Sequence, residues 1–258
     1  MNKIFIQNRK DQKISVMIEK SKDQKGLVFI MHGLGGYKEQ AHLEAVANAF
    51  KEKGFTVVRF DTTNTFGESD GNYEDATLTN YYEDLEDVIN WASKQDFYQE
   101  PFWLGGHSLG GISVAMYAEN YPDKVKAVAP ISPVVSGKLS KENHDSTDLA
   151  KWKKKGYKEN PSASLPGVVK RLKYNEFLDR QKYNLLPKAD RLTMPVLIIV
   201  GEKDTSTPVK HQEILFKSIP GDKKELHVIK GAPHTFREEC HLQEIKDIFL
   251  NWIDKYNK

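Results

Sequence analysis

A serine enclosed by glycines places the strongest constraint on how this chain can fold. The segment 106–111, GHSLGG, follows a short apolar run that is typical of a buried strand, and it precedes a run with the composition of a helix. Gly-x-Ser-x-Gly between a strand and a helix predicts a turn so sharp that Ser108 adopts a strained backbone conformation. Gly106 and Gly110 are small enough to let strand and helix approach closely. The alternative is an ordinary glycine-rich turn that contains an incidental serine.

Two residues far along the chain are candidates to assist this serine. A serine hydroxyl is a weak nucleophile at neutral pH, so it needs a base and a carboxylate that orients the base. Asp204 follows an apolar strand predicted over 194–201, in the loop just past its end. His234 follows the next predicted strand. Because ligands of open parallel sheets bind beyond the carboxyl ends of the strands, these residues are expected to meet Ser108 there.

Other residues near these positions are weaker candidates. Glu202 lies in the same loop as Asp204 and stays open as the acid, although Asp204 lies deeper in the loop. His227 falls inside a predicted strand, where an ordinary structural role is expected. His211 and His241 fall on or beside predicted helices and are expected to be solvated.

A second loop rich in glycine, 31–36 (MHGLGG), follows another apolar run. A tetrahedral intermediate needs two hydrogen-bond donors for its oxyanion. The expected donors are the backbone N–H groups of Leu34 in this loop and of Leu109 directly after the serine. The loop lacks the Gly-Lys-Ser/Thr ending of a phosphate-binding loop and the full Gly-x-Gly-x-x-Gly spacing, which argues against a nucleotide site.

Taken in order, these motifs resemble those of α/β-hydrolases over nearly the whole chain. The motifs are HGLGG at 32–36, GHSLGG at 106–111, GEKD at 201–204 and APH at 232–234. A fifth segment, 59–71, is similar to a loop of cinnamoyl and feruloyl esterases and of monoacylglycerol-lipase-like enzymes. The resemblance implies a serine hydrolase with Ser108 as nucleophile, His234 as base and then acid, and Asp204 as its orienting partner. It also implies an acyl-enzyme, with no metal and no organic cofactor.

The alternation of strands and helices predicts one α/β domain over 1–258. We expect a doubly wound, mostly parallel sheet of eight strands with an antiparallel N-terminal edge. The single cysteine, Cys240, excludes an internal disulfide. No run resembles a signal peptide or is long enough to span a membrane, so a cytoplasmic protein without integral membrane association is expected.

The segment from about 133 to 190 differs from the rest of the chain and is expected to form a helical cap insertion over the serine. Residues 138–191 contain 14 Lys and Arg against 7 Asp and Glu, with no long apolar strand. This charge either forms a solvated face or attracts anionic substrates or a lipid surface. No nucleic-acid-binding module accompanies it.

The insertion also carries more apolar and aromatic residues than a solvated loop needs. We expect Trp152, Tyr174 and Phe177 to bind substrate. The other residues of this kind are Tyr157, Leu165, Val168, Val169, Leu172 and Leu178. The alternative is that they only hold the insertion to the body of the protein.

The function predicted from the sequence is that of a serine carboxylesterase acting on small-molecule esters of modest acyl or aryl groups. A monoacylglycerol lipase, a thioesterase and a peptidase stay open within the same fold. A ligand-binding protein that turns over slowly is the alternative from another class. The natural substrate and the oligomeric state are not predicted, because fold does not determine them.

Overall fold

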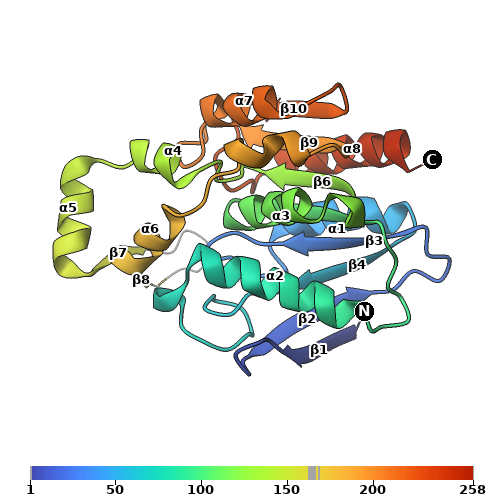
Figure 1. Cartoon of the computed structure of the whole chain (residues 1–258), viewed down its shortest axis with the longest axis horizontal. Coiled ribbons are helices and arrows are strands. Elements are labelled where there is room, and N and C mark those ends of the chain that lie inside the picture. The colour runs from blue at the N-terminus through green and yellow to red at the C-terminus, as the bar shows by residue number, and fades with distance from the viewer. Residues whose placement is uncertain (1, 162–166, 168, 258) are drawn as a thin grey trace.

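The computed structural model describes residues 2–161, 167 and 169–257, and its centre is one eight-stranded sheet (Figure 1). The strand order is β1-β2-β4-β3-β5-β6-β9-β10. The strands are β1 (Asn2–Gln7), β2 (Lys13–Glu19), β3 (Gly26–Met31), β4 (Phe55–Phe60), β5 (Phe102–His107), β6 (Val125–Ile131), β9 (Val196–Gly201) and β10 (Lys224–Ile229). Within this sheet, the β1–β2 and β2–β4 pairs are antiparallel and the other described pairs are parallel. The predicted sheet with its antiparallel N-terminal edge is therefore confirmed.

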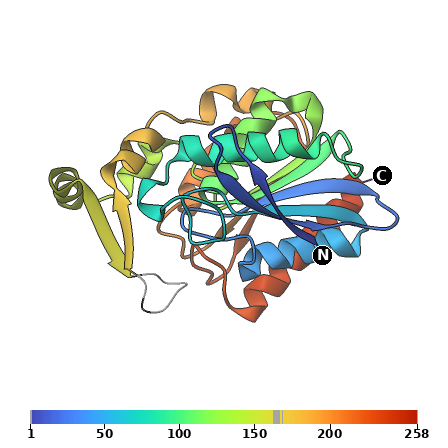
Figure 2. The same ribbon diagram turned by 90° about the horizontal axis from the view of Figure 1, so that it is seen from below.

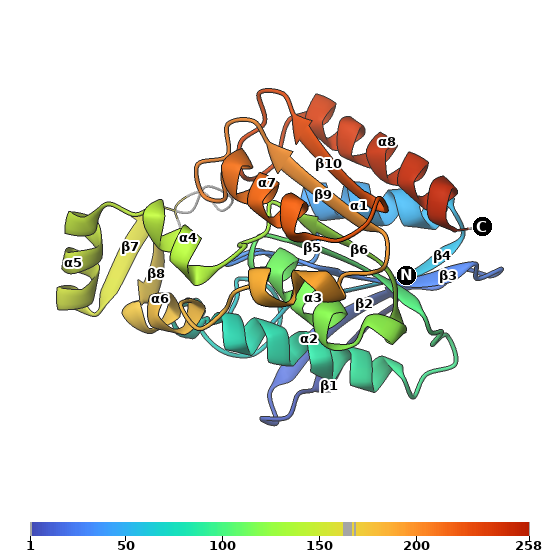
Figure 3. The same ribbon diagram turned by 45° about the horizontal axis from the view of Figure 1, so that its top comes forward.

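Helices cover both faces of the sheet, as Figure 3 shows. One face packs against α1 (Ala41–Glu52) and α8 (Glu239–Tyr256), and the other against α2 (Leu78–Ala92), α3 (Leu109–Asn120) and α7 (Val209–Ser218). Neighbouring residues of β3 point to opposite faces, since Phe29 belongs to one apolar core and Ile30 to the other. No helix among the described residues is long and apolar enough to cross a membrane.

The segment between β6 and β9 contains the expected helices and, in addition, a small second sheet. Its elements are α4 (Gly137–Glu142), α5 (Ser146–Lys155), β7 (Tyr157–Pro161), β8 (Val169–Lys173) and α6 (Tyr174–Arg180). The described residues also form short 3-10 helices, which are η1 (Tyr73–Asp75), η2 (Pro122–Lys124) and η3 (Leu186–Arg191). β7 and β8 pair antiparallel, and Figures 1 and 2 show them with α5 at one end of the molecule, beyond the large sheet.

These two strands leave little sign in the amino-acid pattern, because half of their residues are charged and apolar residues do not alternate with polar ones along them. Two of the apolar residues singled out in this segment, Leu165 and Val168, lie outside the described residues.

A buried carboxyl in α3 makes the stability of this fold depend on pH. Glu119 is 2% exposed, and its Oε1 atom has no hydrogen-bond partner among the described residues. Burial raises the pKa of Glu119 to about 8, although Lys188 and Arg191 act in the opposite direction. Between the ordinary pKa of 4.5 and about 8, the folded protein keeps a proton that the unfolded chain releases. The free energy of unfolding therefore falls as the pH rises through this window.

We expect Glu119→Gln to remove this dependence, because glutamine is isosteric with the protonated carboxyl. The free energy of unfolding of the variant should match that of the parent near pH 4.5 and exceed it at pH 8. The difference should grow by up to about 1.4 kcal/mol for each pH unit between these values. Urea unfolding at both pH values measures the difference. Glu213→Gln, at an exposed position of α7, is the matched control and should leave the profile unchanged. An equal effect of Glu119→Gln at both pH values would contradict the explanation.

Candidate active site

Ser108 occupies the turn between β5 and α3 in a strained backbone conformation. Its φ is 56° and its ψ is −113°, a region that residues other than glycine rarely adopt. A Cβ atom on Gly106 would lie 2.4 Å from the carbonyl oxygen of Gly110, and one on Gly110 would lie 2.4 Å from that of His32. The strand and the helix therefore meet at a distance that only glycine permits, as the sequence predicted, and the loop after β3 comes equally close to the helix.

The structure brings Ser108, His234 and Asp204 together at hydrogen-bond distance. The Ser108 Oγ atom lies 3.0 Å from His234 Nε2, and His234 Nδ1 lies 2.7 Å from Asp204 Oδ2. Each residue follows the carboxyl end of a different parallel strand. In this arrangement Nε2 can accept the serine proton while Nδ1–H donates to the carboxylate, which is the geometry of a general base.

The competing acid in the same loop points elsewhere. Glu202 accepts a hydrogen bond from the backbone N–H of Gly231 at 2.8 Å. The side chain of Asp204, in contrast, is fully buried against His234. Of the two carboxylates that the sequence left open, the structure places Asp204 beside the imidazole.

Asp204 is held ionised by its neighbours. It accepts hydrogen bonds from the backbone N–H groups of Ser206 and Thr207 and from the Thr207 hydroxyl, each at 2.9 Å. Burial by itself would raise the pKa of Asp204, but the bonds from His234 and Thr207 outweigh it and hold the pKa below its ordinary value of 3.8. Sequence reasoning missed Thr207, although an aspartate that bonds the backbone two and three residues ahead is a common local motif.

The two predicted oxyanion donors lie beside the serine. Leu34 and Leu109 both line a cavity that also reaches Ser108 and His234. The backbone N–H groups of Leu34 and Leu109 donate to no other described residue. Leu109 is the first residue of α3, where the helix leaves its N–H groups without internal partners. Both groups are therefore available to a ligand.

Contacts with Ser108 and Tyr81 hold the loop that carries Leu34 in place. A Cβ atom on Gly33 would lie 2.8 Å from the Ser108 Cβ, so the loop lies directly against the serine. The Tyr81 hydroxyl accepts from the N–H of Gly35 at 3.1 Å and donates to the carbonyl oxygen of Gly33 at 3.3 Å. Tyr81 lines neither cavity at the serine, so these bonds hold the loop from its buried side.

A buried ion cluster ties the same loop to the segment after β4. Lys38 and Asp61 are both fully buried, and their charged groups lie 2.7 Å apart. The Lys38 ammonium also lies 2.7 Å from Glu68. Asp61 accepts the backbone N–H groups of Lys38 and Glu68 as well, at 2.8 and 2.9 Å. The segment 59–71, noted in the sequence, thus braces the loop beside the serine.

His107, next to the serine, supports the base. Its Nε2–H donates to the carbonyl oxygen of His234 at 2.8 Å, and the two rings lie 4.8 Å apart. Burial, assisted by the nearby His42 and His234, lowers the pKa of His107 well below its ordinary value. His107 is therefore neutral and acts as a hydrogen-bond donor, not as a second base.

Two of the cavities formed by the described residues reach Ser108. The larger has a volume of about 420 Å³ and extends to Ser140, Asn143, His144, Lys158 and Arg180 of the insertion. The smaller, of about 110 Å³, is bordered by Gln40, Lys170 and Arg237. Sequence reasoning did not single out these lining residues, because nothing in their local pattern distinguishes them from a solvated surface.

Trp152, Tyr174 and Phe177 line neither of these cavities. They pack against one another, with the ring of Trp152 5.5 Å from Tyr174 and 5.9 Å from Phe177. The Trp152 indole N–H donates to the carbonyl oxygen of Leu172 at 3.1 Å. This placement supports the alternative that these aromatic residues hold the insertion together, and substrate binding by them stays a prediction.

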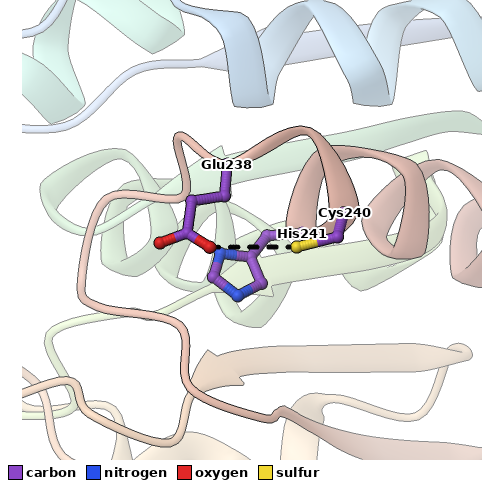
Figure 4. A group of neighbouring side chains, drawn as sticks. All are labelled: Glu238, Cys240 and His241. Atoms are coloured by element: carbon purple, nitrogen blue, oxygen red, sulfur yellow. Dashed lines mark hydrogen bonds between the residues drawn. The ribbon is translucent and has the colours of Figure 1, made fainter.

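One group among the described residues has the composition of a metal site, although it lies outside both cavities at the serine. Glu238, Cys240 and His241, at the start of α8, have potential ligand atoms within 4.8 Å of one another (Figure 4). His241 is buried, the other two are exposed, and the Cys240 thiol donates to Glu238 at 3.9 Å. Such donors are of the type that binds Zn²⁺.

Comparison with known proteins extends over nearly the whole chain. The family model described as "Serine aminopeptidase, S33" matches residues 22–159 and 143–241. The mitochondrial palmitoyl-protein thioesterase ABHD10 of Homo sapiens is 26% identical over 231 residues, which cover 89% of this chain and 73% of that protein. A monoacylglycerol lipase of Mycolicibacterium smegmatis is 25% identical over 257 residues, with coverage of 90% and 89%. The structure of Est1E from Butyrivibrio proteoclasticus with bound ferulic acid has a TM-score of 0.82 and 25% identity, and covers 98% of each chain.

We expect Lys38→Met to destabilise the protein by about 3–5 kcal/mol, because it leaves the buried Asp61 without its counter-charge. Lys3→Met is the matched control, since Lys3 forms an exposed ion pair with the same Glu68, and its loss should cost about 1 kcal/mol or less. Chemical denaturation at neutral pH measures both changes. Similar losses for the two variants would contradict the role given to the buried cluster.

Proposed function

Because the chain belongs to the serine aminopeptidase S33 family of α/β-hydrolases, we propose that it is a serine hydrolase that cleaves carboxylic esters through an acyl-enzyme. Its relatives include esterase-like, lipase and thioesterase proteins, and hydrolysis is common to them. The observation that carries the proposal is the chain of two hydrogen bonds from Ser108 through His234 to Asp204, at 3.0 and 2.7 Å.

In the proposed reaction the Ser108 hydroxyl attacks the ester carbonyl while His234 Nε2 takes its proton. The N–H groups of Leu34 and Leu109 stabilise the oxyanion. His234 then gives the proton to the departing alcohol, and the acyl group remains on Ser108. Water attacks this acyl-enzyme with His234 again as base, which releases the acid and restores the serine. Asp204 stays ionised throughout and stabilises the imidazolium.

The walls of the cavities favour short or polar esters over the other substrates of this family. Of the residues that line the larger cavity, only Leu34 and Leu109 are apolar, so a long acyl chain would gain little from burial there. This argues against palmitoyl thioesters and monoacylglycerols. An aminopeptidase must hold a protonated amino group, yet no Asp or Glu is among the described residues that line either cavity. Short or polar esters fit these walls better.

The first test removes the nucleophile. Ser108→Ala should lower kcat/KM on a simple aryl ester by about 10⁴-fold or more, because the remaining oxyanion site acts without a nucleophile. Ser113→Ala, in the same helix, is the matched control; Ser113 is also buried, and its hydroxyl donates only to the Leu109 carbonyl. It should retain ordinary turnover. Equal activity of Ser108→Ala and the parent would overturn the proposal.

A fluorophosphonate separates an enzyme from a slow ligand-binding relative in the same experiment. The parent should be labelled rapidly and stoichiometrically, and Ser108→Ala should not be labelled. Slow, partial labelling of the parent together with no turnover on a panel of short, long and aromatic esters would favour the binding protein.

A further inference from the structure

The larger cavity joins the serine to two cationic side chains of the insertion, Lys158 in β7 and Arg180 in α6. We propose that the substrate carries one negative charge on the part that extends away from the ester carbonyl, and that Lys158 and Arg180 bind this charge. The inference rests on the proposed esterase function and narrows it to esters of monoanions, such as hemiesters of dicarboxylic acids.

The local charge balance leaves one positive charge without a partner. Arg180 forms an ion pair with the buried Glu176 at 3.1 Å. Lys158 forms no ion pair with any described residue; its ammonium lies over the ring of Trp152, 3.9 Å from the centroid. Two cations and one carboxylate therefore leave a net charge of one, which a single carboxylate of the substrate would neutralise.

Arg180 also carries an unused hydrogen-bond donor. Its Nε atom is buried and has no partner among the described residues, while its side chain is 10% exposed. A buried donor without a partner is costly, so such groups usually have one. An anionic oxygen is the acceptor that a guanidinium binds best.

No protein carboxylate in the described wall of the cavity competes with a substrate anion for the two cations. The described residues that line it include no Asp or Glu. His144 lines the same cavity, and burial, followed by the nearby Arg180 and Lys158, lowers its pKa to about 4. It is therefore neutral at physiological pH. Ser140 and Asn143 add hydrogen-bond donors to the same wall.

The smaller cavity, on the other side of Ser108, also has a positively charged border. Lys170 borders the smaller cavity, and its ammonium lies 3.4 Å from the Gly35 carbonyl oxygen without an ion pair to any described residue. Cations on both sides of a cleft raise the local concentration of anions. The volume of about 420 Å³ on the Lys158 side is the one that can hold a chain ending in a carboxylate.

The test compares two esters that differ by one methyl group and thereby by one negative charge. The 4-nitrophenyl hemiester of glutaric acid is monoanionic, and its methyl diester is the neutral match. We expect kcat/KM for the anion to exceed that for the neutral ester by about tenfold or more, the effect of one charge-assisted hydrogen bond.

Variants then assign the preference to Lys158. Lys158→Met should abolish most of it, measured as the ratio of kcat/KM for the anionic ester to kcat/KM for the neutral ester in the same variant. Lys158→Glu should reverse it, whereas Lys158→Arg should retain it. Lys153→Met, at an exposed position of α5 outside the cavity, makes the same change in net charge and should retain the preference. The rate of fluorophosphonate labelling and the melting temperature show whether each variant is folded.

The parent chain alone can refute the inference. Equal kcat/KM for the two esters, or a preference for the neutral one, would overturn it and leave the proposed esterase function intact. A preference for the anion that is unchanged in folded Lys158→Met would also overturn it. Absence of hydrolysis of either ester, with no labelling of Ser108, would instead refute the esterase function and the inference together.

Discussion

The close approach of three backbone segments at Ser108 is the constraint on which the rest of the site depends. Gly106 and Gly110 let β5, α3 and the loop after β3 meet with no room for a side chain. The φ of 56° at Ser108 persists because the buried strand before it and the buried helix after it determine the path of the chain. The serine is thereby fixed next to Gly33, and β9 and β10, two and three strands further along the sheet, lead into the loops that supply Asp204 and His234.

Charge is divided between the body of the protein and the insertion. Around the serine, burial keeps the supporting His32, His42 and His107 neutral by lowering their pKa values, whereas Asp204 is ionised by its hydrogen bonds. The uncompensated cation of the larger cavity comes from the insertion. In the proposed function, the body would provide the groups for acyl transfer, and the insertion would provide the charge that distinguishes substrates.

The sequence predicted what local patterns determine and missed what depends on packing. Apolar runs followed by glycine or polar loops located the strands, the turn at Ser108 and the strand-end loops. They favoured Asp204 but could not exclude Glu202, because both lie in one loop and the direction of the side chains separates them. Composition marked the insertion as basic, but which lysine faces the cavity depends on how the short, charged β7 and β8 pair. For the same reason, aromatic content could not show that Trp152 packs inside the insertion.

The most direct test of the account is mass spectrometry of the protein quenched during turnover of a 4-nitrophenyl ester. This leaving group departs readily, so the acyl-enzyme should accumulate before deacylation. The account predicts a mass increase equal to that of the acyl group, which peptide mapping locates on Ser108. An acyl group on another side chain, such as the exposed thiol of Cys240, or hydrolysis that continues with Ser108 blocked by a fluorophosphonate, would contradict it.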